Sequence, residues 1–260
     1  MKNYRVVFIL NLCLVFNACK KDTKISQESV VTSSQTYGNL TIEFENMVDS
    51  LNLQFATNYV NQNGDTFQVS TFKYFISNIV ITKNDNSTFV EPESYHLIDH
   101  SDPTSLIVTL TKVPTGSYKS ISFMVGVDST RNVSGAQSGA LSQSSGMFWT
   151  WSTGYIMLKL EGTSPKSPDL GKNIYFHVGG FEGINKAQRN FTLNFGSTTA
   201  NVSTSITPKI NLQTDLLEIF KNPSLVDFSS IYDVTNINSR SRMIADNYAD
   251  MIRLEHVHNN

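Results

Sequence analysis

Hydrophobic and polar residues alternate over short stretches of the chain, which is the pattern of β-strands that bury one face. The clearest alternation lies at residues 40–44 and 72–81. Similar stretches follow at residues 95–98, 105–110, 118–127, 149–160, 174–178, 191–195 and 202–210. Turn-forming residues separate them, as in Asn84-Asp85-Asn86. Short strands joined by such turns predict an all-β fold, an antiparallel β-sandwich.

Two segments near the C-terminus have helical patterns instead. Residues 214–220 form the first, and Pro223 would end it. In the second, Ser241 could cap a helix whose apolar residues recur at helical spacing. Those apolar residues are Ile244, Tyr248, Met251 and Ile252. We therefore expect a helical tail over about residues 212–260, which would hold the last residues in a fixed place.

Residues 1–19 have the pattern of a bacterial export signal, with Lys2 and Arg5 ahead of an apolar run at residues 6–16. The run is shorter than the roughly 20 residues that a membrane-spanning helix needs. It ends in Phe16-Asn17-Ala18-Cys19, which resembles a lipobox with phenylalanine in place of the usual leucine. We expect cleavage before Cys19 and acylation of that cysteine. A soluble secreted protein with an incidental cysteine is the alternative.

Charged residues follow the cysteine at once, in Lys20-Lys21-Asp22, and resemble the surface-export signals of Bacteroidota lipoproteins. The expected location is the outer membrane, facing the periplasm or the cell surface. Residues 20–37 are rich in polar residues and read as a flexible tether. The folded domain is then expected over residues 38–260, with its helical tail at the end.

Charge and cysteine content exclude several functions. With 20 basic and 22 acidic residues the formal charge is −2, so nucleic acid is not an expected partner. If Cys13 leaves with the signal and Cys19 carries lipid, the mature chain has no free thiol for a disulfide, a metal cluster or a nucleophile. The chain also lacks the linear motifs of serine hydrolases, P-loop NTPases, zinc proteases and dinucleotide-binding enzymes. No enzyme activity is expected.

Both tryptophans of the chain, Trp149 and Trp151, lie in one strand-like segment at residues 146–162. On a strand their side chains would share a face. His177 lies downstream in the apolar segment 174–180. Residues such as these more often belong to an ordinary core than to a metal site. The long polar loop at residues 128–140 either covers the tryptophan strand or is a flexible excursion.

Several motifs, taken together, resemble the MbnP-like copper-binding family. They are Gly126-Val127-Asp128, the segment 146–151, Gly154-Tyr155, Leu160-Glu161-Gly162 and Phe176-His177-Val178-Gly179. The resemblance covers residues 38–220 and extends into the tail. It implies an envelope β-sandwich that binds one copper ion, in some members through histidine and a kynurenine made from tryptophan. It also implies a partner, a di-haem maturation enzyme of the cytochrome c peroxidase type.

Carried over by position, the resemblance makes Trp149 or Trp151 the candidate for oxidation and His177 the histidine that is retained. The chain departs from the family in two ways. It lacks the cysteines that some relatives have in this domain, and its tryptophan segment contains no histidine. The first departure removes a disulfide-braced site, and the second puts the metal geometry of the better-known members in doubt.

The tail adds a His-x-His pair, His256 and His258, whose imidazoles would share one side of an extended segment and could chelate Cu(II), Zn(II) or Ni(II). With His177 they would form a three-imidazole site, and the thioether of Met147 would be a further ligand for Cu(I). The pair could also be a flexible, accidental feature of the chain end. His96 and His100 read as a strand end and turn and are left out of the predicted site.

The expected function is therefore copper binding in the cell envelope, for acquisition, storage or delivery rather than catalysis. One alternative is a carbohydrate- or protein-binding surface module, in which Trp149 and Trp151 form an exposed stacking platform. The other is a purely structural envelope domain. A buried indole close to His177 would favour metal binding, whereas an exposed pair in an open groove would favour the platform, and histidines remote from one another would favour the structural domain.

Overall fold

The computed structural model describes residues 35–150 and 152–259 of the chain. The predicted export signal, the predicted acylation site Cys19, nearly all of the predicted tether and Trp151 lie outside the described residues. The first strand begins at Tyr37, one residue before the predicted start of the folded domain. Within the two described ranges, no helix has the length and apolar character needed to cross a bilayer.

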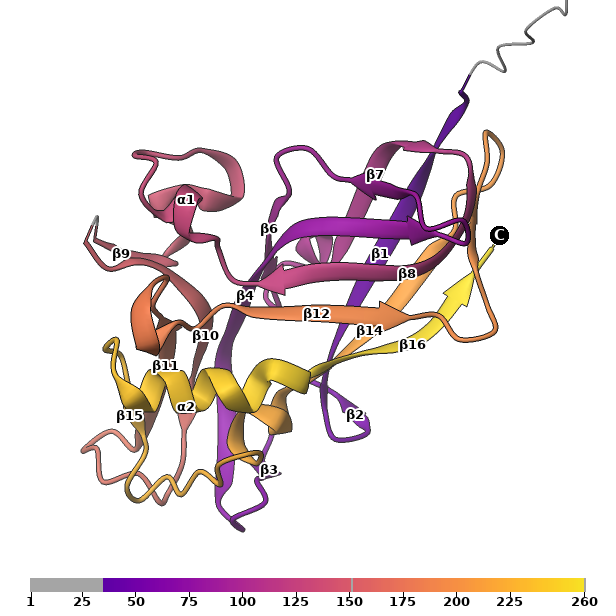
Figure 1. Cartoon of the computed structure of the whole chain (residues 1–260). Coiled ribbons are helices and arrows are strands. Elements are labelled where there is room, and N and C mark those ends of the chain that lie inside the picture. The colour runs from indigo at the N-terminus through magenta and orange to yellow at the C-terminus, as the bar shows by residue number, and fades with distance from the viewer. Residues whose placement is uncertain (1–34, 151, 260) are drawn as a thin grey trace, which may run out of the picture. The chain divides into compact units, whose positions relative to one another are not determined.

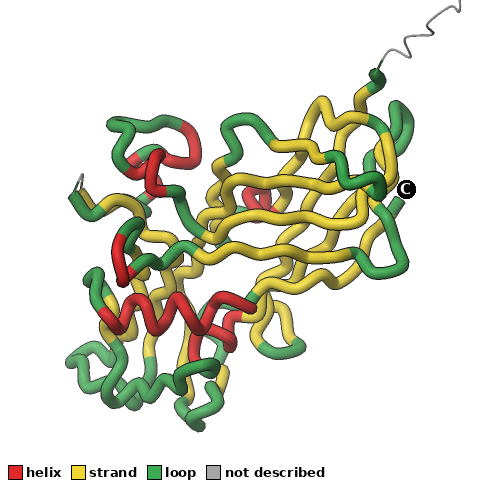
Figure 2. Tube along the Cα trace, in the orientation of Figure 1, coloured by secondary structure: helices red, strands yellow, loops and turns green. Residues whose placement is uncertain are grey.

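The described chain forms two β-sheets (Figures 1 and 2). The smaller sheet consists of β1 (Tyr37–Val48), β2 (Leu51–Asn52), β7 (Ile107–Pro114), β14 (Lys209–Asp215) and β16 (Ile252–His258). The long strands of the larger sheet are β4 (Thr66–Lys83), β8 (Gly116–Val125), β10 (Gly154–Thr163), β11 (Asn173–Gly179) and β12 (Arg189–Asn194). Its short strands are β3 (Tyr59–Val60), β5 (Thr88–Val90), β6 (Tyr95–Asp99), β9 (Phe148–Thr150), β13 (Ala200–Val202) and β15 (Asp233–Val234).

In the smaller sheet β1 is the central strand. It pairs in parallel with β14 and antiparallel with β7, and β16 adds to the far edge of β14. The predicted alternation at residues 40–44 is confirmed, because Leu40, Ile42 and Phe44 are buried. Glu43 and Glu45 lie on the opposite, outer face of the strand, where they are partly exposed.

In the larger sheet β4 connects the two halves. Its first half pairs with β10 and its second half with β8. The register with β8 shifts between Ser77 and Val80, where Asn78 has a φ of 55°. A left-handed residue of this kind within a strand bends it, and asparagine accepts that conformation more readily than most residues. The bend explains how β4 pairs with β10 along its first half and with β8 along its second half.

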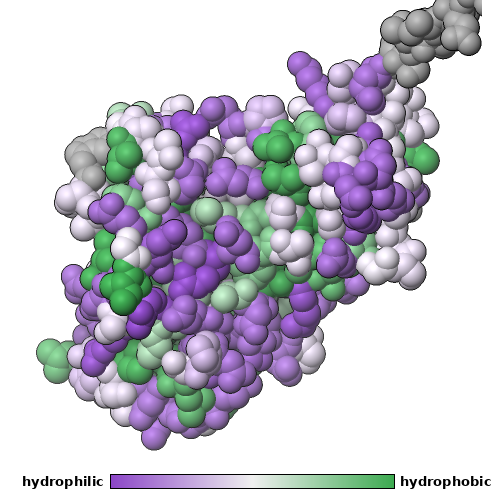
Figure 3. All heavy atoms as spheres, viewed as in Figure 1, coloured by the Kyte–Doolittle hydropathy of each residue, from purple (hydrophilic) through white to green (hydrophobic). Residues whose placement is uncertain are grey.

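Aromatic side chains fill the space between the sheets. Phe44 of β1 lies 6.3 Å, between ring centroids, from both Tyr74 of β4 and Phe123 of β8. All three are buried, so the inner faces of the two sheets pack on each other and the predicted β-sandwich is confirmed. Polar residues cover most of the outer face seen in Figure 3, and apolar residues show there as separate patches.

A second aromatic cluster closes one end of the larger sheet. The ring of Phe220 lies 5.3 Å from Phe67, 5.4 Å from Phe176 and 5.0 Å from Phe228. Phe220 ends the 3-10 helix η5 (Leu216–Phe220). The helix predicted at residues 214–220 is thus shorter than expected, because residues 214 and 215 complete β14 and Asp215 caps the turn by accepting from the amide of Leu217.

The predicted C-terminal helix is α2 (Ser239–Asn247), which contacts β11 and η5. It is shorter than predicted, because Met251 and Ile252 lie beyond its end and Ile252 begins β16. Its cap is Asn238 rather than Ser241. The Asn238 side chain accepts from the amides of Arg240 and Ser241, and the Ser241 hydroxyl accepts from the amide of Asn238, which is a capping box. The other helical segments are α1 (Ser129–Asn132), η1 (Pro103–Leu106), η2 (Gly139–Leu141), η3 (Gln143–Ser145), η4 (Gly183–Asn185) and η6 (Tyr248–Asp250).

Several predicted strands differ in extent from the observed ones. Residues 105 and 106 end η1, so β7 begins only at Ile107. Residues 149–160 form two strands, β9 and β10, because the chain turns between them and Gly154 enters β10 with a φ of 73°. Residues 202–210 also belong to two strands, since β13 ends at residue 202 and β14 starts after Pro208.

Candidate functional site

The structure separates the predicted ligands into two places. His177 lies on β11 of the larger sheet, whereas His256 and His258 lie on β16 of the smaller sheet. In Figure 1, β11 and the C-terminal end of β16 are on opposite sides of the domain. The expected three-imidazole site is therefore not formed. In the described part of the chain, no three His, Cys, Asp or Glu side chains gather closely enough to hold a metal ion.

His177 faces outward from β11. The strand buries Ile174, Phe176 and Val178 on its inner face, so the residues between them lie on the outer face. The Nε2 atom of His177 is 2.8 Å from Oε1 of Glu161, on the neighbouring strand β10. The Glu161 carboxylate also accepts from the hydroxyl of Thr71, on β4, at 3.1 Å. Three adjacent strands thus hold the histidine and its carboxylate.

The electrostatics of this pair favour a neutral imidazole. Burial lowers the pKa of His177, and the Glu161 carboxylate only partly opposes that effect. Burial acts to raise the pKa of Glu161, but its hydrogen bonds with His177 and Thr71 and the nearby charge of Lys159 outweigh burial, so the pKa is below its usual value. An ionised carboxylate only accepts, so Nε2–H donates to it. Nδ1, which has no hydrogen-bond partner within the described ranges, then keeps its lone pair.

The indole of Trp149 packs against Gly179, on the same strand as His177. A Cβ atom on Gly179 would be only 2.5 Å from Cζ3 and 3.0 Å from Cη2 of the indole, so glycine makes room for the ring. Gly179 is two residues after His177 on the same face of β11, and the Cα atoms of such residues are about 7 Å apart. The structure therefore brings Trp149 and His177 to neighbouring positions on one face.

The segment that carries Trp149 is fixed to the sheet. Asn132, at the end of α1, accepts from the amide of Tyr155 at 2.9 Å, and the Tyr155 hydroxyl donates to the carbonyl of Leu141 at 2.7 Å. The Lys159 ammonium reaches the carbonyl of Gly146 at 3.4 Å. Of the two expectations for the polar loop, the structure supports a covering segment that is packed on the start of β10.

Met147 has a different environment from the one expected of a ligand. It is fully buried and belongs to the hydrophobic core. Its carbonyl accepts from the amide of Ile156 at 2.9 Å, which fixes the backbone as well. The thioether therefore lies in the core, while His177 lies on the outer face of the sheet.

His256 and His258 are neighbours on the outer face of β16. Their ring centroids are 4.2 Å apart, with the rings at 79°. In the strand register His256 lies opposite Asn211 and His258 opposite Lys209, both on β14. The register shifts just before His256, and Nδ1 of His256 is 3.2 Å from Oε2 of Glu255. The two imidazoles thus lie on one side of an extended tail, as the sequence predicts.

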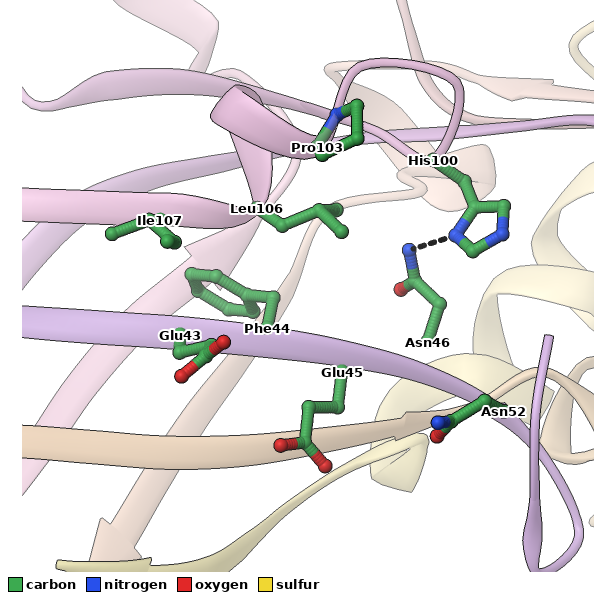
Figure 4. Close-up of a pocket in the computed structure, with 9 residues that line it drawn as sticks. All are labelled: Glu43, Phe44, Glu45, Asn46, Asn52, His100, Pro103, Leu106 and Ile107. Carbon is green, nitrogen blue, oxygen red and sulfur yellow. Dashed lines mark hydrogen bonds between the residues drawn. The ribbon is translucent and has the colours of Figure 1, made fainter.

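The two histidines left out of the predicted site have other partners. Nδ1 of His100 lies 3.3 Å from Nδ2 of Asn46 (Figure 4), and Nε2 lies 3.0 Å from the carbonyl of Leu53. Burial lowers the pKa of His100, so it is neutral and both nitrogens are engaged. His100 lines a hollow of about 480 Å³. His96 is 2.9 Å from Glu91.

The sequence did not identify two residues that contact or face the candidate histidines, Glu161 and Asn211. Glu161 stands in one of the quoted motifs, but its pairing with His177 depends on the register of β10 with β11, which places Lys159 opposite His177. Asn211 carries no local signal. Only the pairing of β14 with β16 shows that it faces His256.

Comparisons with known proteins agree with this fold. The model of the MbnP family matches residues 37–238. Among solved structures, MbnP from Methylosinus trichosporium is similar, with a TM-score of 0.51 and 13% sequence identity over 77% of this chain and 80% of that chain. At that identity the likeness shows the fold. No curated protein matches the chain.

Proposed function

Because the chain belongs to the MbnP family, we propose that it binds copper in the cell envelope and serves in copper acquisition, storage or delivery rather than in catalysis. Membership of the family supports a copper-related role. The family does not by itself say which residues of this chain hold the ion. The proposal for the site comes from the outer face of β11.

One observation carries the assignment of the site, the arrangement of Glu161, His177 and Trp149. In metal sites a ligating histidine commonly donates its second N–H to a carboxylate, which fixes the tautomer and makes the imidazole a better donor. Glu161 is placed to do this for His177, and leaves Nδ1 as the metal-binding nitrogen. Trp149 lies on the same face. Of the two tryptophans that are candidates for oxidation, it is the one that the structure describes.

The fit to copper is incomplete in the unmodified chain. The described residues of this face offer one imidazole nitrogen, and an indole is a poor ligand. Oxidation of Trp149 to kynurenine would add an aniline-type nitrogen beside His177. We therefore propose that maturation by a partner of the di-haem peroxidase type precedes full affinity at this site. Lipid attachment through Cys19 would hold the protein at the outer membrane.

The rival function, a stacking platform for a sugar, needs an open indole face. Trp149 is instead partly buried against Gly179. This placement favours the metal site over the platform. Trp151, on which the platform would also depend, lies outside the described residues.

The test uses protein purified from its native host. Intact mass would report the acyl chains and any conversion of tryptophan to kynurenine, and elemental analysis would report copper. We expect modified wild-type protein with copper bound, loss of that copper in His177→Asn, and no loss in the matched control His96→Asn. Trp149→Phe should lose both the modification and the copper. Native-host protein that binds copper no better than at micromolar levels, even after this maturation, would overturn the proposal.

A further inference from the structure

We propose a second cation site, separate from the first, in which His256, His258 and the side-chain oxygen of Asn211 bind a divalent first-row transition metal. The site lies on the outer face of the smaller sheet, and it goes beyond the proposed function because it needs no oxidised tryptophan. The site would be occupied whenever the concentration of the free divalent metal exceeds the dissociation constant of the site, whether or not Trp149 is oxidised.

The two imidazoles provide the first part of the site. Residues two apart on a strand project from the same face, and these two rings already lie with centroids 4.2 Å apart. The pair is held in register by the β14 partners Asn211 and Lys209. Since His256 and His258 belong to a hydrogen-bonded strand, little conformational freedom is lost when they chelate a metal.

Asn211 provides an independent observation. Its side chain is on the outer face, yet the residue is only 5% exposed. Its Nδ2 atom donates to Oε2 of Glu43 at 3.2 Å and lies 3.5 Å from Oε1 of Glu45. Carboxylates accept but do not donate, so they fix which end of the amide faces β1. Both carboxylates belong to β1, and Figure 4 shows them close to that strand.

The oxygen of the Asn211 amide is left without a partner. Oδ1 is inaccessible to water and makes no hydrogen bond with the described residues. Because Nδ2 is turned toward β1, Oδ1 is turned to the other side, where β16 places His256 in register. A buried carbonyl oxygen without a donor is unfavourable, and a cation held by the two imidazoles would satisfy it.

The charges around the pair suit a cation. Glu43, Glu45 and Glu255 are the nearby carboxylates, and Lys209, opposite His258, is neutralised by Glu43 at 2.7 Å. Glu255 contacts Nδ1 of His256, which leaves Nε2 of that ring for the metal. Two imidazole nitrogens and an amide oxygen are ligands that bind Cu(II) more tightly than Ni(II) or Zn(II). Waters would complete the coordination.

The experiment titrates the whole protein, made in a host without the oxidising partner, with copper(II) chloride and then with zinc chloride. We expect one Cu(II) per chain by calorimetry, and an electron paramagnetic resonance spectrum with two nitrogen ligands. His256→Asn/His258→Asn should weaken Cu(II) binding about 100-fold or more, because both nitrogen donors are lost. Asn211→Ala should weaken it about 10-fold while both nitrogens remain in the spectrum.

His177→Asn is the matched control and should leave this Cu(II) binding unchanged. Binding of wild-type strength in the double histidine variant would overturn the second site. If His177→Asn abolishes binding and the double variant does not, the second site is wrong while the proposed function stands. Conversely, if the double variant loses Cu(II) and native-host protein holds no copper at His177, the second site stands and the proposed function fails. Thermal unfolding without metal checks that each variant folds.

Discussion

The two places where the chain gathers histidine differ in how the imidazole is held. His177 and Glu161 lie 2.8 Å apart, with side chains 17% and 27% exposed, between strands of the larger sheet. His256 and Glu255 lie 3.2 Å apart, with side chains 40% and 36% exposed, on an edge strand of the smaller sheet. A carboxylate orients an imidazole strongly only where water is excluded. The first site therefore relies on one preorganised histidine, and the second on two.

The largest effect is expected from Gly179→Val, which acts on the first site alone. A Cβ atom there would lie 2.5 Å from the ring of Trp149 and 2.9 Å from the carbonyl oxygen of Tyr155, so the indole must leave its place beside His177. We expect the free energy of unfolding to fall by about 1–3 kcal/mol and copper binding at His177 to be lost. Urea unfolding and copper content would measure both effects.

The control for this variant is Thr163→Val, at an exposed position of β10. It should change neither stability nor metal content, because the side chain is exposed and away from Trp149 and His177 along the strand. Cu(II) binding at His256 and His258 should also survive Gly179→Val. If the glycine variant kept its stability and its copper, the indole would not be packed as described.

The sequence alone predicted most of the long strands but not the grouping of the histidines. Alternation predicted the stretch at residues 72–81 as a strand, and it lies within β4, because burial of one face dominates local structure. The pattern failed at residues 149–160, where the apolar residues on both sides of a turn were assigned to one strand. The turn falls at Ser152 and Thr153, just before Gly154, whose left-handed backbone glycine tolerates best.

The sequence could not show that His177 lies apart from His256 and His258. Each residue was identified as a candidate from its local pattern, but its sheet depends on pairing with strands far away in the chain. The resemblance to the family placed Trp149 and His177 in one site, and the structure brings them to one face. Glu161 and Asn211 came only from strand register, which no local pattern contains.

The next largest effect is expected from Glu161→Gln. The amide keeps the shape of the carboxylate, but it loses the negative charge that makes the His177 imidazole a strong donor. We expect copper affinity at the first site to fall about 10-fold or more in native-host protein, with no change at the second site. Competition with a copper chelator would measure it. Equal affinities for the variant and the wild type would show that Glu161 does not position the ligand.

A smaller effect, on stability, is expected when the pH is lowered. The pKa of His177 is lowered from the ordinary 6.5, mainly by burial, so the folded state favours the neutral ring. The stability linked to His177 is therefore fully present above pH 6.5 and is lost as pH falls through the lower, folded-state pKa. His100 shares this direction, so the comparison must be with His177→Asn. The difference in melting temperature between wild type and variant should shrink below pH 6.5. A constant difference down to pH 4 would contradict the lowered pKa.

The smallest effect is expected from Glu255→Gln, the counterpart of Glu161→Gln at the second site. Both groups of the Glu255–His256 pair are more than a third exposed, so water screens their interaction and an exposed ion pair is worth about 0–1 kcal/mol. We expect Cu(II) affinity at His256 and His258 to change about fivefold or less, because the second imidazole and Asn211 still hold the ion. Calorimetry on the unmodified protein would measure it. A loss as large as that of Glu161→Gln at the first site would mean that burial is not what separates the two sites.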